Sequence, residues 1–192
     1  METRRSKRST GSREALLVID VINDLTFPGG EKVLPWAERL VMPLLRVRRV
    51  ADRAKIPFIY INDNFGLWHE GFKEIYAHCT RRGSPARDIV RKLKPRPHDY
   101  FILKPRHSAF YATSLAPLLD DLGVKRLVLA GIATNLCVLF TAHDAHMRKY
   151  ELVVLSDCCA AESDFDHDVA LKQLERFCHA TILRGDEFRP RK

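Results

Sequence analysis

The segment KRLVLAGIATNLCVLFTAHDAHMRKY, from Lys125 to Tyr150, decides the fold that the sequence predicts. Its first part, Arg126 to Ala130, is a short apolar run that is typical of a fully buried strand. From Asn135 to Lys149 the apolar spacing becomes helical, so a helix is expected there. A cysteine, Cys137, therefore lies at the expected start of a helix.

This position has a chemical consequence for Cys137. The N–H groups in the first turn of a helix have no partner within the helix and carry partial positive charge, which favours a thiolate over a thiol. Cys137 is therefore a candidate nucleophile. On position alone, a small buried apolar side chain without any chemistry is the commoner explanation of a free cysteine.

The rest of the chain alternates between short apolar runs and amphipathic segments. Strands are expected at 15–20, 57–61, 100–103, 126–130, 151–155 and 180–183, and helices at 36–55, 86–93, 113–122, 135–149 and 165–177. The stretch 62–80 is expected to be irregular and to help form the wall of a pocket. This alternation predicts an α/β fold with a doubly wound, mainly parallel six-stranded sheet and helices on both faces.

Three chemically active residues follow the ends of different expected strands. They are Asp20 after the first strand, Lys104 after the third and Cys137 a few residues past the fourth. Ligands of such sheets bind beyond the carboxyl ends of the strands, near the point where the strand order reverses. Taken singly, Lys104 would be a surface lysine and Asp20 a loop acid. Together with the thiol they make a set for covalent hydrolysis, in which Asp20 takes the thiol proton and returns it to the leaving amine.

Composition limits the class of protein. At 192 residues, with 46% hydrophobic and 29% charged residues, the sequence predicts a single domain over 14–192. More than half of the formal charge of +8 comes from the two ends, and residues 1–13 are expected to form a basic, disordered tail, so nucleic acid is not an expected partner. Five cysteines, including the adjacent Cys158 and Cys159, do not resemble a disulfide framework and predict a cytoplasmic location. No apolar run approaches the length of a membrane span, so no membrane partner is expected.

Three motifs, in order, carry a resemblance to a known family. They are ALLVIDVINDL around Asp20, KPRHSAF from Lys104, and GIATNLCV with Cys137. On these motifs, and over Glu14 to Leu183, the chain resembles the isochorismatase-like cysteine hydrolase family. The resemblance implies a three-layer sandwich, a catalytic triad of Asp20, Lys104 and Cys137, and a homo-oligomer.

The same resemblance implies an oxyanion hole near the thiol. It places a non-proline cis peptide bond between Ile132 and Ala133, with the N–H groups of Ala133 and Cys137 as the donors. Such donors would stabilise the negative charge on the oxygen of a tetrahedral intermediate.

Four residues are candidates for the lining of the substrate pocket. Phe27 and Trp68 are aromatic residues in loops that follow strands, Asn64 has a polar neighbourhood, and Tyr111 lies close to Lys104 in the sequence. Each of them could equally belong to the core or to an oligomer contact.

The resemblance predicts a hydrolase that cleaves a C–N bond of a small amide, carbamoyl or ureido compound through a thioester and releases ammonia or an amine. Members of the family that cleave the vinyl ether of isochorismate need not use a cysteine nucleophile, so the presence of Cys137 favours C–N hydrolysis. The alternatives are an isochorismatase-type ether hydrolase and a non-catalytic binding protein that retains the fold.

Neither a cofactor nor a metal ion is expected. Nicotinamidases hold a metal ion with an Asp-x-His motif and a second histidine, whereas the corresponding segment here is Asn62-Asp63-Asn64. Asp63 with His69 or His78 could approximate such a site, but surface histidines are the commoner explanation of these residues.

Overall fold

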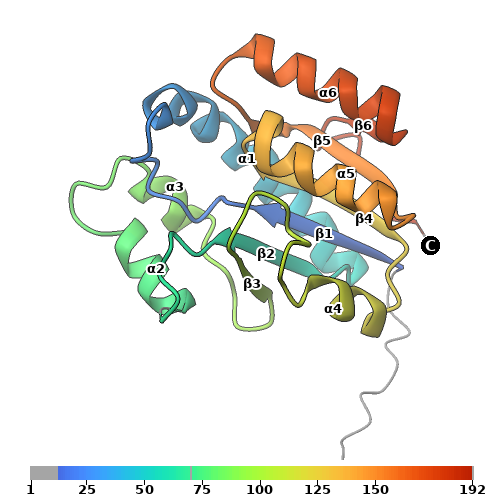
Figure 1. Cartoon of the computed structure of the whole chain (residues 1–192), viewed down its shortest axis with the longest axis horizontal. Coiled ribbons are helices and arrows are strands. Elements are labelled where there is room, and N and C mark those ends of the chain that lie inside the picture. The colour runs from blue at the N-terminus through green and yellow to red at the C-terminus, as the bar shows by residue number, and fades with distance from the viewer. Residues whose placement is uncertain (1–12, 70, 192) are drawn as a thin grey trace, which may run out of the picture.

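The computed structural model describes residues 13–69 and 71–191, so most of the expected basic tail, residues 1–12, lies outside the described part of the chain. The strands form one sheet, and helices cover both of its faces (Figure 1). The elements are, in chain order, β1 (Glu14–Ile19), α1 (Gly30–Ala54), β2 (Phe58–Asp63), α2 (Phe72–Cys79), α3 (Arg87–Lys92), β3 (Tyr100–Lys104), α4 (Leu115–Asp121), β4 (Arg126–Ile132), the π-helix η1 (Thr134–Val138), α5 (Leu139–Met147), β5 (Glu151–Ala160), α6 (Asp164–Cys178) and β6 (Thr181–Leu183).

The sheet has six strands in the order β3-β2-β1-β4-β5-β6, and all neighbouring pairs are parallel. The predicted doubly wound α/β fold is therefore confirmed. From β1 the chain builds the sheet outward through β2 and β3, then returns to pair β4 with the other side of β1. The strand order thus reverses between β1 and β4, and the carboxyl ends of these two strands lie at the place where sheets of this kind bind ligands.

Strand β1 lies in the middle of the sheet, and all six of its residues are buried. Its alternate side chains enter two different hydrophobic clusters, Leu16 and Val18 on the side of α1 and α3, and Leu17 and Ile19 on the side of α4, α5 and α6. Figure 1 shows α5 and α6 in front of the sheet and α1 behind it. Burial on both faces explains why the strand is a continuous apolar run.

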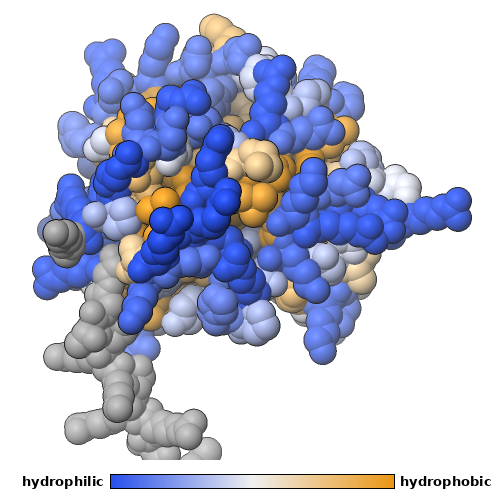
Figure 2. All heavy atoms as spheres, turned by 180° about the vertical axis from the view of Figure 1, so that it is seen from behind, coloured by the Kyte–Doolittle hydropathy of each residue, from blue (hydrophilic) through white to orange (hydrophobic). Residues whose placement is uncertain are grey.

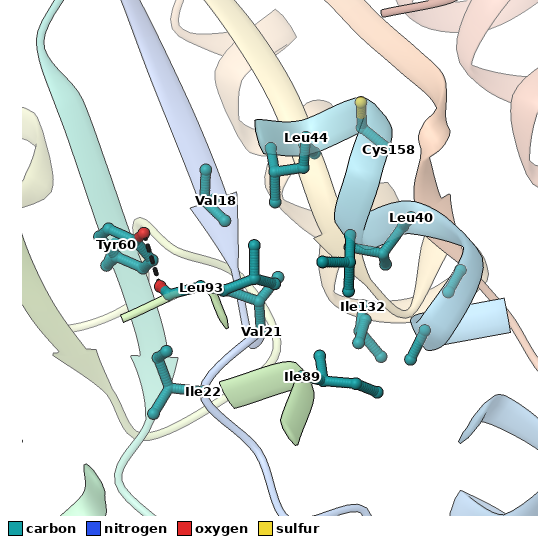
Figure 3. Close-up of a cluster of buried hydrophobic side chains, with 14 of the residues drawn as sticks. Val18, Val21, Ile22, Leu40, Leu44, Tyr60, Ile89, Leu93, Ile132 and Cys158 are labelled. Carbon is teal, nitrogen blue, oxygen red and sulfur yellow. Dashed lines mark hydrogen bonds between the residues drawn. The ribbon is translucent and has the colours of Figure 1, made fainter. Parts of the chain in front are cut away.

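The cluster on the α1 side is shown in Figure 3. Leu40 and Leu44, one helical turn apart on α1, pack towards Val18 of β1 and Cys158 of β5. The opposite face of the helix carries charged side chains, and Figure 2, which shows the molecule from behind, is accordingly dominated by hydrophilic residues with hydrophobic ones visible between them. The sheet is thus covered on this side by an amphipathic helix.

Helix α1 is longer than the sequence predicts. It begins at Gly30 instead of Trp36 and includes Pro35 and Pro43, so neither proline ends it. Within the described part of the chain, no helix has both the length and the apolar character needed to cross a membrane.

The stretch expected to be irregular, 62–80, contains a helix, and this part of the prediction is wrong. Helix α2 buries Ile75 and Cys79, which lie four residues apart on one face. The carboxylate of Asp24, after β1, is 3.0 Å from Nε2 of His78 and accepts a hydrogen bond of 2.8 Å from Arg81. These contacts fix the end of α2 against the loop that follows β1.

Candidate active site

The structure brings three predicted residues together at the carboxyl edge of the sheet. Asp20 directly follows β1 and has a left-handed backbone with φ of 52°. Lys104 is the last residue of β3, and Cys137 lies in η1, just after β4. The site therefore spans the point where the strand order reverses, and the long side chain of Lys104 lets β3, two strands away from β1, contribute to it.

The three side chains form one connected set. Nζ of Lys104 lies 2.8 Å from Oδ2 of Asp20 and donates to Sγ of Cys137 at 3.5 Å. Oδ1 of Asp20 accepts a hydrogen bond of 2.7 Å from the backbone N–H of Asp63, whose own carboxylate lies 3.8 Å from Lys104. All three central residues are buried, with Lys104 entirely inaccessible to solvent. A carboxylate, an ammonium and a thiol therefore share a nearly water-free volume.

Burial and the charge of the partner act in opposite directions on the pKa of Asp20 and on that of Lys104. Burial raises the pKa of Asp20, and the nearby charge of Lys104 opposes this rise without cancelling it. For Lys104, burial favours the neutral amine, but the negative charge of Asp20, joined by that of Cys137 when it is a thiolate, outweighs burial and raises the pKa. The pKa of Lys104 is thus raised in favour of its ammonium form, and the carboxyl of Asp20 has an increased affinity for a proton.

The thiol of Cys137 differs from the prediction. Burial, followed by the negative charge of Asp20, raises the pKa of Cys137, while Lys104 opposes the rise. Cys137 also lies inside the π-helix η1 and not in the first turn of an α-helix. The resting form is thus the thiol, and the expected resting thiolate is not supported. A proton acceptor is needed, and Asp20 is close enough to Cys137 to lower the acidity of its thiol.

The carboxyl end of β4 runs very close to β1, with Gly131 paired to Ile19. Gly131 has φ of 132°, and a Cβ at this position would lie 2.0 Å from the carbonyl oxygen of Ile19. Only glycine therefore allows β4 to pass β1 here. The next peptide bond, between Ile132 and Ala133, is cis, at the position that the resemblance implies. The carbonyl of Ala133 accepts hydrogen bonds from the N–H groups of Leu136 and Val138, both at 3.1 Å.

A pocket of about 430 Å³ opens beside the triad. It is bounded by the segments that follow β2 and β3, and its lining residues are Asp63, Asn64, Gly66, Trp68, Pro105, Arg106 and His107. Two of the four predicted lining residues, Asn64 and Trp68, are among them. The volume suits a small molecule.

The other two predicted lining residues, Phe27 and Tyr111, do not line this pocket. Phe27 lies in the turn before α1, where its carbonyl accepts the N–H of Gly30, and its side chain is partly exposed. Tyr111 follows Phe110, which is buried in the core, so the Tyr111 side chain extends outward and is 58% exposed. Closeness to Lys104 in the sequence did not place Tyr111 close to the pocket.

One residue of the site was missed by sequence reasoning. His107 lines the pocket, and its Nδ1 lies 3.9 Å from Sγ of Cys137. Its ring packs against Phe140 of α5, with ring centroids 5.6 Å apart. The only sequence signal was its position three residues after Lys104 in the motif KPRHSAF.

The histidines considered as metal ligands have other surroundings. His78 pairs with Asp24, and His69 is exposed in the loop after β2. The carboxylate of Asp63 faces Lys104 at 3.8 Å. The contacts of Asp63 therefore connect it to the triad and give no support to a pairing with these imidazoles.

Comparison with known proteins shows which family the chain is similar to. The family model described as Isochorismatase domain matches residues 14–185 of this chain. The protein "Uncharacterized isochorismatase family protein YaaI" of Bacillus subtilis (strain 168) is 43% identical over 174 residues, which cover 91% of this chain and 95% of that protein. The ureidoacrylate amidohydrolase RutB of Pantoea ananatis is 37% identical over 105 residues, which cover 54% of this chain and 42% of RutB.

A solved structure is similar over almost the whole fold. The crystal structure of N-carbamoylsarcosine amidase from Thermoplasma acidophilum superimposes with a TM-score of 0.71 at 27% sequence identity. The match covers 92% of this chain and 98% of the amidase chain. The fold and the order of the elements that carry the site are therefore shared with an enzyme whose name describes C–N chemistry.

Proposed function

The chain belongs to the Isochorismatase domain family, and on this premise we propose that it is a hydrolase acting on a C–N bond, with Cys137 as its nucleophile. The observation that carries the proposal is the position of Lys104, whose Nζ contacts both Asp20, at 2.8 Å, and the sulfur of Cys137, at 3.5 Å, beside a pocket. The names of the similar proteins, a ureidoacrylate amidohydrolase and an N-carbamoylsarcosine amidase, support a small amide, carbamoyl or ureido compound as the substrate.

The first step is the activation of the thiol. Asp20 accepts the proton of Cys137, since burial has raised the pKa of the carboxyl and so increased its affinity for a proton. The ammonium of Lys104 stays beside both groups and stabilises the thiolate while it forms. Because the ion pair is almost dry, this attraction is screened much less than it would be in water.

The second step is the attack on the substrate. The thiolate adds to the carbonyl carbon, and the C=O electron pair moves to oxygen, where the N–H groups of Ala133 and Cys137 are the proposed donors. Collapse of this adduct breaks the C–N bond while a proton passes to the departing nitrogen, so ammonia or an amine is released and a thioester remains on Cys137. Water then hydrolyses the thioester and regenerates the thiol.

The alternative of ether hydrolysis makes no use of the contact between Lys104 and the sulfur of Cys137. The alternative of a non-catalytic binding protein makes no use of the buried proton acceptor beside that thiol. Hydrolysis of a C–N bond uses both, and we therefore prefer it.

Capture of the thioester tests the proposal. N-carbamoylsarcosine, ureidoacrylate and acetamide are supplied to the enzyme, and ammonia release is measured with and without hydroxylamine. For a substrate that is turned over, we expect hydroxylamine to capture the acyl group, because it attacks a thioester faster than water does. The captured product is a hydroxamate from acetamide and an N-hydroxyurea from the carbamoyl and ureido compounds. Substrate turnover without any captured product, in an enzyme that also tolerates loss of Cys137, would contradict the proposal.

A further inference from the structure

The sulfur of Cys137 lies between two different environments. Towards the protein interior it contacts Lys104, which is inaccessible to solvent, and the buried Asp20. Towards the pocket it faces His107, whose Nδ1 is 3.9 Å from Sγ and whose side chain is exposed. A substrate bound in the pocket would therefore have the imidazole on its own side of the sulfur.

Asp20 is poorly placed to serve a group that leaves through the pocket. Its Oδ1 is occupied by the N–H of Asp63 at 2.7 Å, its Oδ2 by Lys104 at 2.8 Å, and the residue is 4% exposed. None of Asp20, Lys104 and Cys137 is among the pocket's lining residues, whereas His107 is, and its Nδ1 lies 3.9 Å from Sγ of Cys137. Asp20 therefore approaches the sulfur from the interior, and His107 approaches it from the pocket.

From this arrangement we infer that His107 is a further catalytic residue, which protonates the leaving nitrogen and then activates the hydrolytic water. The inference rests on the proposed function and adds to it. It also changes one step of the sequence-based expectation, which gave both proton transfers to Asp20.

The proton balance closes without any further reagent. In acylation the thiol proton goes to Asp20, the C–S bond forms, and the C–N bond breaks as protonated His107 gives a proton to the departing nitrogen. In deacylation neutral His107 takes a proton from water, the resulting hydroxide adds to the thioester, and the C–S bond breaks. The leaving sulfur recovers its proton from Asp20, so both groups return to their starting forms.

The imidazole of His107 lies among charged and uncharged groups. Charged groups near the imidazole are Arg106 on its own loop and, at the strand ends, Lys104 and Asp63. From α5 the neighbour is the uncharged ring of Phe140. Phe140 holds the imidazole by a ring contact and leaves its nitrogen atoms available for proton transfer.

A test must separate proton donation from a merely structural role of the ring. We propose to measure the single-turnover acylation rate of His107→Gln on two probes, the best amide of the panel above and 4-nitrophenyl acetate. The amide needs a proton on its leaving nitrogen, whereas 4-nitrophenolate leaves without one. We expect the variant to lose about 10²-fold to 10³-fold on the amide and to stay within about threefold of the wild type on the ester.

Two matched variants serve as controls. Phe140→Leu removes the ring contact and keeps the imidazole, and Arg106→Gln changes the adjacent pocket residue. Both are expected to affect the amide and the ester by the same factor. Unfolding curves show whether any variant fails to fold, and the exposed position of His107 predicts a curve like that of the wild type.

Three outcomes are decisive. Selective loss of amide acylation in His107→Gln supports the inference. An equal loss on both probes, or no loss on the amide, overturns it and leaves the proposed function intact. A wild-type enzyme that forms the acyl-enzyme with the ester but cleaves no amide contradicts the proposed function, and the inference with it.

Discussion

Among the described residues, two deeply buried ion pairs can be compared, of which one is part of the candidate site and the other is not. Lys104 with Asp20 forms the active-site pair, whose side chains are 0% and 6% exposed. Arg48 with Asp99 forms the structural pair, whose side chains are 4% and 1% exposed. Burial and charge are thus almost the same in both, so neither property by itself indicates catalysis.

The difference lies in the third partner of each pair. Arg48 donates at 2.7 Å to the hydroxyl of Tyr60, which in turn donates to the backbone carbonyl of Leu93 (Figure 3 shows this second bond). Burial raises the pKa of Tyr60, and the Arg48 guanidinium also lies over the ring of Phe58, so this network joins α1 to β2. Lys104 instead contacts a thiol whose sulfur lies 3.9 Å from His107, a residue that lines a pocket. A buried ion pair supports chemistry when a nucleophile and an open space lie beside it.

The largest expected effect comes from Asp20→Asn in the active-site pair. Asparagine keeps the size of the side chain but cannot accept the thiol proton, so kcat/KM for the best amide should fall by about 10³-fold. Asp63→Asn, which changes the second carboxylate near Lys104, is the matched control and should cost much less. Ammonia release measures both. Activity of Asp20→Asn within threefold of the wild type would remove the role of Asp20 as a base.

The matching change in the structural pair, Asp99→Asn, should act on stability alone. Removing one partner of a buried pair leaves Arg48 without its counter-charge and should lower the free energy of unfolding by about 3–5 kcal/mol. The kcat of the folded fraction should not change. Urea denaturation and ammonia release together test this, and a loss of kcat without a loss of stability would show that the two pairs are not functionally distinct.

A pH profile sharpens the comparison further. Because burial raises the pKa of Asp20 above its usual 3.8, the carboxylate needed as a base is lost at a higher pH than for an ordinary aspartate, and kcat/KM should fall there. A raised folded-state pKa means that the contribution of Asp20 to stability is fully present below pH 3.8 and is lost as the pH rises through the folded value. Protonation of Asp20 thus removes activity without unfolding the protein. If kcat/KM fell only at or below pH 3.8, the raised pKa of Asp20 could not be the reason for the fall.

The smallest expected effect concerns the thiol itself. Because burial and the charge of Asp20 raise the pKa of Cys137, its alkylation by iodoacetamide should be slow at neutral pH and should accelerate above pH 9.0, the usual pKa of a thiol. In Asp20→Asn one of these causes is gone, so alkylation at pH 9 should become a few times faster, while that of Cys178 stays the same. Mass spectrometry of the two cysteine peptides measures this. Rapid alkylation of Cys137 near pH 6 would contradict the raised pKa and would support the resting thiolate that the sequence predicts.

The fold and the meeting of Asp20, Lys104 and Cys137 were predictable from the sequence for the same physical reason, whereas their catalytic roles stay predictions. Buried parallel strands are continuous apolar runs, and their carboxyl ends meet at one edge, so the residues that follow Ile19, Leu103 and Ala130 had to come near each other. The expected homo-oligomer and cytoplasmic location stay predictions.

The remaining features depend on contacts between segments that no local pattern reveals. Helix α2 was missed because it is short and buries only Ile75 and Cys79, and the contact of Asp24 with Arg81 fixes its end from a distant loop. The raised pKa of Cys137 comes from burial and from Asp20, and sequence spacing measures neither. His107 was missed because only the turn after β3 brings it to the sulfur.

The most direct test of the account is the activity of Cys137→Ala on the best amide of the panel. The side chain becomes smaller inside the core, but no charge is left without a partner, so the variant should fold. We expect ammonia release below about 10⁻⁴ of the wild-type rate, because the nucleophile is gone and no other described thiol lies beside the Lys104–Asp20 pair. A folded variant that keeps more than about a tenth of the wild-type rate would contradict a mechanism through Cys137.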